Sequence, residues 1–144
     1  MADDFELDRF IEAQDHGGTY DRAVTELRAG RKRSYWMWFV FPQLFGLGQS
    51  PTSQRYGIRS LAEARAYRQH PILGPRLIEC AGVVAALPDV TAEDVFGGID
   101  ATKLHSSMTL FAQASPDDAV FTQVLDKFFG GRTDAATLRL LAAD

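Results

Sequence analysis

Apolar residues recur along most of the chain at spacings of three and four, which is the period of an α-helix with one buried face. The clearest case is residues 72–87, where Leu73, Leu77 and Val84 share one stripe. Similar stripes, separated by Gly, Pro or capping residues, follow one another without an internal repeat. The pattern predicts an all-α fold in which residues 1–144 form one compact domain of about seven helices, with 72–87 as the central helix.

Local signals predict where several helices begin and end. Ser60 and Glu63 have the spacing of a capping box, and Asp134 can cap a final helix. Gly97 and Gly98 predict a break between a short helix and a longer one that begins near Asp100.

The run of large rings at residues 35–41 fits two local structures. Its aromatic and valine content suits a strand, whereas its length also suits a short buried helix. A lone strand in a helical chain would have no partner, so we predict a helix that ends before Pro42, which has no backbone N–H. Residues 43–59 are rich in Gly, Ser and Pro and predict one long loop, and loops of this length are commonly functional.

The composition is that of a globular protein rather than of a nucleic-acid binder. Hydrophobic residues make up 46% of the 144 residues, enough for a core, and the formal net charge is -4, whereas general nucleic-acid binders are usually basic. The single cysteine, Cys80, excludes an internal disulfide. The three histidines lack metal-ligand spacing, so neither a metal nor a cofactor is predicted. The acidic N-terminus has no signal-peptide pattern and no apolar run is long enough to span a membrane, so a cytoplasmic protein is expected.

Three motifs carry a family resemblance. They are Gly30-Arg-Lys-Arg-Ser, Trp36-Met-Trp-Phe-Val-Phe-Pro-Gln-Leu and Ser106-Ser-Met-Thr-Leu-Phe, and shorter matches run in order along nearly the whole chain. The chain resembles the bacterial family known as domain of unknown function number 1810, whose members are sometimes labelled calpastatin. The resemblance implies a single all-helical domain and no established activity. The calpastatin label does not fit, because the chain has no repeat that would wrap a protease and is too apolar for a disordered inhibitor. Family members commonly carry His where this chain has Tyr35, so a role that needs an imidazole there cannot operate.

The basic cluster before the aromatic run and the polar residues after Asp100 indicate a pocket for an anionic metabolite, such as a nucleotide or an ADP-ribose derivative. Lysine and arginine side chains can hold phosphates, and Trp or Tyr rings can stack on a base. The candidate catalytic residues are Asp100 and Lys103, with Asp100 as a general base if burial raises its pKa. The candidate ligand-binding residues are Lys32, Arg33, Trp36, Trp38, Gln43, Ser50, Tyr56, Lys103, Ser106 and Ser107. This hypothesis requires the basic cluster and the segment around Lys103 to meet in space.

The ADP-ribose alternative comes from a faint resemblance. Asp100 and Lys103, followed by Asp134, Thr137 and Leu138, have spacings similar to those of helical N-glycosidases that act on ADP-ribose derivatives. Such spacings arise easily in helices, so the resemblance adds hydrolysis as an option beside simple binding.

Each candidate also has a structural interpretation. The basic cluster can complement the C-terminal dipole of the preceding helix, aromatic rings belong to the core more often than to a site, and Ser106 and Ser107 can bond to the preceding turn. A second hypothesis is a protein-interaction module without catalytic activity, in which the aromatic run and the loop from Gly46 to Gly57 form an exposed apolar patch. Nucleic-acid binding is the weakest of the three hypotheses, because the chain is acidic overall.

Overall fold

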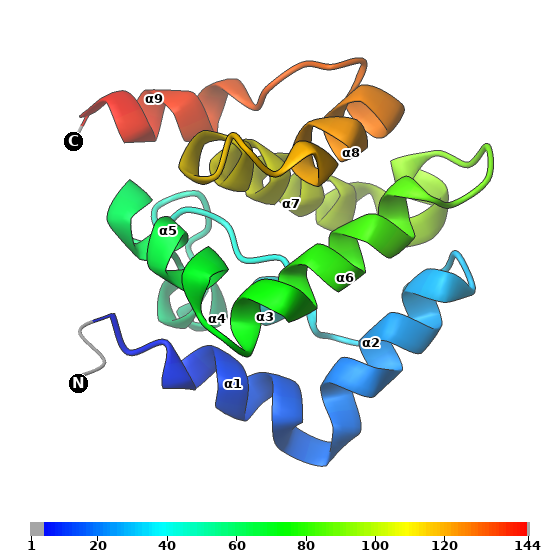
Figure 1. Cartoon of the computed structure of the whole chain (residues 1–144), viewed down its shortest axis with the longest axis horizontal. Coiled ribbons are helices and arrows are strands. Elements are labelled where there is room, and N and C mark those ends of the chain that lie inside the picture. The colour runs from blue at the N-terminus through cyan, green and yellow to red at the C-terminus, as the bar shows by residue number, and fades with distance from the viewer. Residues whose placement is uncertain (1–4, 144) are drawn as a thin grey trace.

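Helices form most of the chain between residues 5 and 143, which is the part that the computed structural model describes (Figure 1). No β-strand occurs among these residues, and the buried apolar side chains form one core, so the prediction of a single all-α domain is confirmed. About seven helices were predicted. The described residues form more, and two of them, α3 and α4, are only four and five residues long. The elements are α1 (Asp8–Asp15), the 3-10 helix η1 (His16–Gly18), α2 (Thr19–Arg28), α3 (Met37–Val40), α4 (Pro51–Arg55), α5 (Leu61–Gln69), α6 (Leu73–Ala85), α7 (Ala92–Ala114), α8 (Ala119–Phe129) and α9 (Ala135–Ala143).

Helix α7 is one of two helices in the described part of the chain that pack against four others. It packs against α8, α5, α9 and α3, and in Figure 1 it runs through the middle of the molecule, partly hidden by α8. From Leu104 to Phe111 its residues are buried except for His105. Helix α6, within the range 72–87 that was predicted to be central, also packs against four helices, namely α8, α5, α2 and α3. Its apolar stripe was visible in the sequence because one face of α6 stays exposed, whereas the more fully buried part of α7 shows no such stripe.

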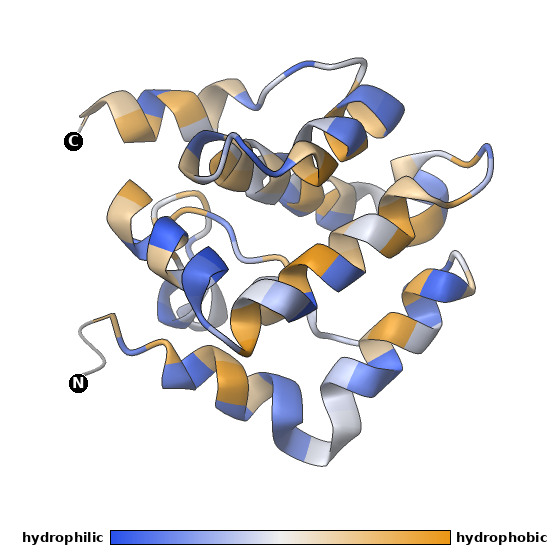
Figure 2. Cartoon of the chain, viewed as in Figure 1, coloured by the Kyte–Doolittle hydropathy of each residue, from blue (hydrophilic) through white to orange (hydrophobic). Residues whose placement is uncertain are grey.

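Helices α1, α2 and α6 are amphipathic, as the apolar spacing predicted. Figure 2 shows hydrophobic and hydrophilic residues alternating along each of them. Their buried residues include Phe10 on α1, Leu27 on α2 and Leu77 on α6, each at most 1% exposed. These three helices therefore cover the core with one face and leave the other face in contact with water.

The aromatic run contains one short helix, α3, which ends before Pro42 as predicted. Trp36, Met37, Val40 and Phe41 are all buried in the core. Tyr35 is 85% exposed. Trp38 and Phe39 are half-buried. Tyr35 is thus the most exposed ring of the run, and the other rings lie partly or fully inside the fold.

The long loop predicted over residues 43–59 is not confirmed. Helix α4 lies within it, because the Ser50 hydroxyl accepts a hydrogen bond from the Ser53 amide at 3.1 Å and Pro51 occupies the first turn, where its fixed φ suits a helix. On either side of α4 the backbone is paired, since the Phe45 amide donates to the Ile58 carbonyl at 2.7 Å and a parallel bridge joins Leu44 and Ile58. Residues 43–59 are thus an ordered segment whose two ends pair with each other.

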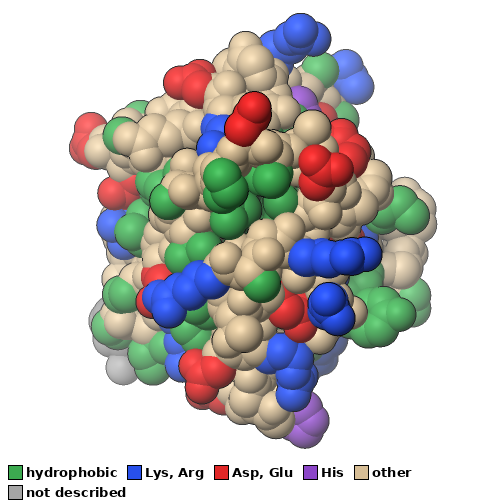
Figure 3. All heavy atoms as spheres, turned by 90° about the vertical axis from the view of Figure 1, so that its right-hand side faces the viewer, with side chains coloured by type: hydrophobic (Ala, Val, Ile, Leu, Met, Phe, Trp, Pro, Cys, Tyr) green, Lys and Arg blue, Asp and Glu red, His purple; other side chains and the backbone are tan. Residues whose placement is uncertain are grey.

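The surface carries mixed charges. On the face drawn in Figure 3, Lys and Arg side chains are interspersed with Asp and Glu side chains, in keeping with the net charge of -4. Among residues 5–143 we find no helix that combines the length and apolar character needed to cross a membrane.

Candidate functional site

A cavity of about 530 Å³ lies between the segment that leads into α3 and the part of α7 that follows Gly97. We refer to it as the lysine pocket. It brings together Lys32 and Lys103, which are far apart in the sequence. Its lining residues are Lys32, Arg33, Ser34, Tyr35, Trp38, Phe96, Gly97, Gly98, Ile99, Asp100 and Lys103.

A carboxylate shared by two lysines forms the polar centre of the pocket. The Nζ atom of Lys32 lies 2.8 Å from Asp100 Oδ2, and the Nζ atom of Lys103 lies 3.0 Å from Asp100 Oδ1. Burial raises the pKa of Asp100, but the hydrogen bonds from the two lysines outweigh it and hold the pKa below its ordinary value. The condition for Asp100 to act as a general base, a raised pKa, is therefore not met, and Asp100 instead holds the two ammonium groups in place.

The two lysines keep hydrogen-bond donors that the described residues do not use. An ammonium group has three N–H donors. Lys32 directs one to Asp100 and one to the Ser34 carbonyl, and Lys103 directs one to Asp100. One donor of Lys32 and two of Lys103 remain, and the two positive charges exceed the single negative charge of Asp100. The centre of the pocket is thus both cationic and rich in donors.

Aromatic rings support both ammonium groups. Lys103 Nζ lies 4.6 Å from the centroid of the Trp38 ring, and Lys32 Nζ lies 5.0 Å from that of Trp36 and 5.9 Å from that of Tyr35. A ring face attracts a cation electrostatically. The side chains of Lys32 and Lys103 are only 7% and 16% exposed, so both charges are held in positions where water screens them weakly.

Glu26 of α2 fixes the segment that carries Lys32. Its carboxylate accepts hydrogen bonds from the backbone amides of Arg33 and Ser34 at 2.7 and 3.0 Å, from the Ser34 hydroxyl at 2.6 Å, and from Trp36 Nε1 at 2.9 Å. Burial raises the pKa of Glu26, but these four bonds outweigh it and lower the pKa to about 2. Sequence reasoning missed this residue, because nothing in the sequence distinguishes it from a solvated acid on a helix surface.

A break in α7 opens the other side of the pocket. Gly97 has φ 77° and ψ 165°, which is not helical and suits glycine, so the helix is interrupted where Gly97 and Gly98 predicted a break. A side chain at either glycine would meet no atom within 4 Å, so this backbone is open to a ligand. The backbone amide of Lys32 donates to the Val95 carbonyl at 2.7 Å. That bond ties the basic segment to the short helical turn before the break.

Of the candidate residues, Lys32, Arg33, Trp38, Asp100 and Lys103 line the lysine pocket. The basic cluster and the segment around Lys103 therefore meet, as the hypothesis required. No ion pair engages the Arg33 guanidinium within the described part of the chain. Arg33 thus adds an exposed positive charge to the lining of the pocket.

The other candidates lie elsewhere. Trp36 is fully buried, with its indole N–H on Glu26. Ser50 caps α4, and Tyr56 packs in the core against Phe39, with ring centroids 5.3 Å apart. Gln43 is 9% exposed, and its carbonyl accepts the Ile58 amide at 2.9 Å. None of these side chains is among those that line the lysine pocket.

Ser106 and Ser107 are both buried in α7 and differ in their bonding. The Ser106 hydroxyl bonds the Thr102 carbonyl at 3.1 Å and Asp134 Oδ2 at 3.3 Å, and Asp134 caps α9 as predicted through the Thr137 amide at 3.0 Å. The Ser107 hydroxyl has no hydrogen-bond partner among the described residues. Buried hydroxyls without partners reduce stability.

These neighbours provide a matched pair of variants. Ser106→Ala is expected to lower the free energy of unfolding by about 1 kcal/mol, because it breaks a bond in the α7–α9 contact. Ser107→Ala is expected to leave that free energy unchanged or to raise it, because it removes an unsatisfied hydroxyl. Urea unfolding of the two variants measures the difference, and a larger loss for Ser107→Ala would contradict this description of α7.

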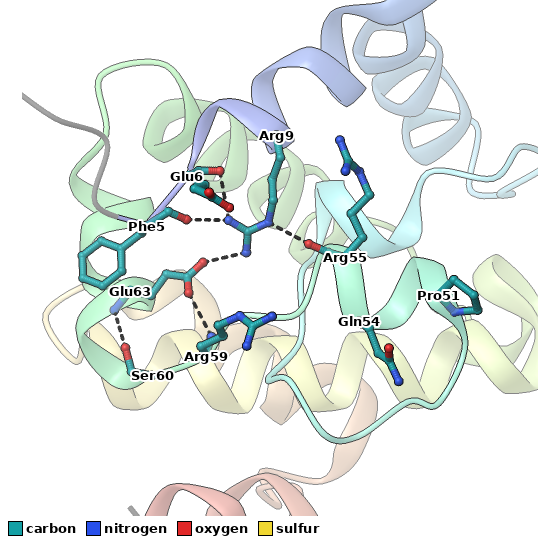
Figure 4. Close-up of a pocket in the computed structure, with 9 residues that line it drawn as sticks. All are labelled: Phe5, Glu6, Arg9, Pro51, Gln54, Arg55, Arg59, Ser60 and Glu63. Atoms are coloured by element: carbon teal, nitrogen blue, oxygen red, sulfur yellow. Dashed lines mark hydrogen bonds and ion pairs between the residues drawn. The ribbon is translucent and has the colours of Figure 1, made fainter.

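A second and larger cavity, of about 800 Å³, lies beside α1, α4 and the start of α5. Its centre is Arg9, whose guanidinium donates to Glu63 Oε2 at 2.8 Å and to the carbonyls of Phe5, Glu6, Arg55 and Gly57. Figure 4 shows the bonds to Phe5, Glu6, Arg55 and Glu63 converging on Arg9, while the Arg55 side chain points away from them. Because the five N–H donors of the Arg9 guanidinium are then all used, Arg9 has none left for a ligand, whereas Lys32 and Lys103 keep unused donors, and we treat the lysine pocket as the stronger candidate site.

The part of the chain between residues 5 and 143 contains no group of three His, Cys, Asp or Glu side chains that could hold a metal ion. The thiol of Cys80 is buried, and burial raises its pKa to about 12. A thiol with so high a pKa is protonated at neutral pH and is a poor nucleophile.

The fold and the pocket define a small all-helical protein with a cationic, ring-lined cavity. The chain belongs to the family described as a protein of unknown function (DUF1810), whose model matches residues 4–141. It is similar to the conserved hypothetical protein Rv1873 from Mycobacterium tuberculosis, solved by crystallography at 1.38 Å. The two are 54% identical, the match covers 96% of this chain and 97% of that chain, and the TM-score is 0.93. No curated protein matches the chain.

Proposed function

We propose that the protein binds a small phosphate-bearing metabolite, of the class that includes nucleotides and ADP-ribose derivatives, in the lysine pocket. One observation carries the proposal. Lys32 and Lys103, which are far apart in the sequence, reach one cavity, share the carboxylate of Asp100, and keep unused N–H donors. A phosphate group presents several acceptor oxygens and a negative charge, which match those donors and the excess positive charge.

The weak screening of both ammonium groups increases their attraction for an anion. Their side chains are mostly buried, and electrostatic attraction is stronger at low local dielectric. The part of α7 that begins after Gly97 also directs the positive end of its dipole towards this side of the cavity, which favours a bound anion.

The pocket supports binding better than hydrolysis. A general base works best with a pKa near the operating pH, and the pKa of Asp100 lies below its ordinary value. Asp100 remains an anion at neutral pH and is already bonded to two ammonium groups. Its role in the proposal is to hold the ammonium groups of Lys32 and Lys103 in position for a ligand.

A cytoplasmic location is part of the proposal. The single cysteine is a free, buried thiol, which fits a reducing compartment. Cell fractionation followed by immunodetection tests this point independently of ligand binding.

Lys103→Met is expected to weaken binding of the ligand at least tenfold, because a charge-assisted hydrogen bond contributes about 1.5–3 kcal/mol and tenfold corresponds to about 1.4 kcal/mol. Methionine retains an unbranched apolar stem of similar length and removes the ammonium group, including its cation–π contact with Trp38. The measurement is isothermal titration calorimetry against AMP, ADP, ADP-ribose and inorganic phosphate, chosen after a thermal-shift screen.

The matched control is Lys127→Met on α8. Lys127 is exposed and does not line the lysine pocket, so its removal is expected to change affinity less than twofold. The proposal is overturned if none of these anions binds the wild type, or if the two lysine variants lose affinity equally.

A further inference from the structure

The mouth of the lysine pocket carries most of the large apolar side chains that the fold leaves in water. Three such residues are exposed in the described part of the chain, namely Tyr35 at 85%, Ile99 at 77% and Ile72 at 42%. Tyr35 and Ile99, the two most exposed, both line this one cavity. Large apolar side chains that gather at a cavity, rather than scatter over the surface, mark a binding site.

The two side chains reach the mouth from different segments. Tyr35 precedes α3, on the same segment as Lys32, and Ile99 follows the glycine break in α7, next to Asp100. Both are far more exposed than the lysine side chains, which are 7% and 16% exposed. The pocket therefore has a cationic interior and an apolar, ring-bearing mouth.

The spacing of these two parts suits one ligand that has both an anionic group and a flat ring. Lys32 Nζ lies 5.9 Å from the centroid of the Tyr35 ring. An anion bound to Lys32 would thus leave the attached part of a small ligand beside the face of Tyr35. A sugar phosphate offers no flat apolar surface there, whereas a nucleobase can stack on a tyrosine ring.

We propose that the lysine pocket selects phosphate esters that carry an aromatic base, with Tyr35 stacking on the base and Ile99 covering it at the mouth of the pocket. This inference rests on the proposed function and narrows its ligand from phosphate-bearing metabolites to nucleotides. Stacking is available to every base because each has a π-face. Purine and pyrimidine nucleotides are therefore both accepted, with the larger purine ring bound more tightly.

The test compares AMP with ribose 5-phosphate, which has the same phosphate and sugar but lacks the base. In isothermal titration calorimetry the wild type is expected to bind AMP at least tenfold more tightly, in line with the contribution of base–aromatic stacking. Tyr35→Ala is expected to remove most of that advantage, because it weakens the binding of AMP far more than the binding of ribose 5-phosphate. Tyr35→Phe is expected to retain the advantage, because it keeps the ring.

Two control variants separate this inference from the proposed function. Ile72→Ala removes an exposed apolar side chain outside the pocket and is expected to change neither affinity. Lys103→Met is expected to weaken the binding of both AMP and ribose 5-phosphate. If both ligands bind, depend on Lys103 and are bound equally by the wild type and by Tyr35→Ala, base recognition is wrong and the anion pocket stands.

If neither ligand binds, the anion pocket and base recognition are both wrong. Sedimentation of the wild type and of Tyr35→Ala then decides whether the exposed side chains serve self-association. A concentration-dependent dimer that disappears in Tyr35→Ala would assign Tyr35 to an interface between copies of the chain and would likewise overturn base recognition.

Discussion

Glu26→Gln is expected to lower the free energy of unfolding by about 3 kcal/mol at pH 7 and by much less near pH 3. The carboxylate of Glu26 accepts four hydrogen bonds from the segment that carries Lys32, and these bonds lower its pKa from 4.5 to about 2. Each pKa unit corresponds to about 1.4 kcal/mol of preference for the charged form in the folded state. A glutamine resembles the protonated acid and loses that preference.

The pH dependence follows from the direction of the shift. Because the folded pKa lies below the unfolded one, the stabilisation is nearly complete above about pH 4.5 and declines as the pH falls through the folded pKa of about 2, below which both states are protonated. The stability difference between wild type and Glu26→Gln should therefore shrink over this range. Other carboxylates titrate in both proteins and largely cancel in the difference.

Urea unfolding of both proteins between pH 3 and pH 7 measures this difference. Glu12→Gln is the control, because Glu12 is exposed on α1 and an exposed carboxylate contributes little. A Glu26→Gln penalty that stays constant over the whole pH range would show that the carboxylate acts by shape alone. We also expect Glu26→Gln to weaken ligand binding at pH 7, since Arg33 and Ser34 lose their charged acceptor.

Gly74→Ala is expected to lower the free energy of unfolding by about 3 kcal/mol, although alanine is the better helix former. Gly74 lies in the first turn of α6, and a Cβ atom there would lie 2.0 Å from the backbone carbonyl oxygen of Arg68 at the end of α5. A backbone atom cannot move aside as a flexible side chain can, so α5 and α6 would have to separate, at the cost typical of severe overpacking. The close α5–α6 turn exists because residue 74 has no side chain.

Gly82→Ala, in the same helix, is the matched control. A Cβ atom at Gly82 would meet nothing within 4 Å, so the alanine is expected to raise the free energy of unfolding by about 0.5–1 kcal/mol through helix propensity and reduced freedom of the unfolded chain. Thermal and urea unfolding of the two variants give opposite signs if the description is correct. A stabilised Gly74→Ala variant would contradict the close approach of α5 to α6.

Several features of the fold follow from the sequence by itself because short-range physics decides them. The Ser60 hydroxyl caps α5 by accepting the Glu63 amide at 3.0 Å, and Gly97 interrupts α7 with a backbone conformation that suits glycine. Pro42 comes directly after Phe41, the residue that ends α3. In each case the signal and the structure that it produces lie within one helical turn, so the residue types alone predicted the outcome.

Residues 43–59 show the limit of such short-range sequence signals. Ser50 and Pro51 begin α4 by the same local chemistry, but the density of Gly, Ser and Pro concealed that start. The pairing of Leu44 with Ile58 joins residues too far apart for any local pattern to indicate. For both reasons, the predicted long loop is not confirmed.

The sequence by itself determined an all-helical domain, most of its helix ends and the residue types available for an anion site. Only the tertiary structure decided which helices pack against α7, that Trp36 is buried against Glu26, and that Lys32 and Lys103 meet at Asp100. The physical reason is that apolar spacing specifies which face of a helix is buried but not which other segment covers it. Glu26 on α2 and Lys103 on α7 contribute to one site only because packing brings both next to the segment that carries Lys32.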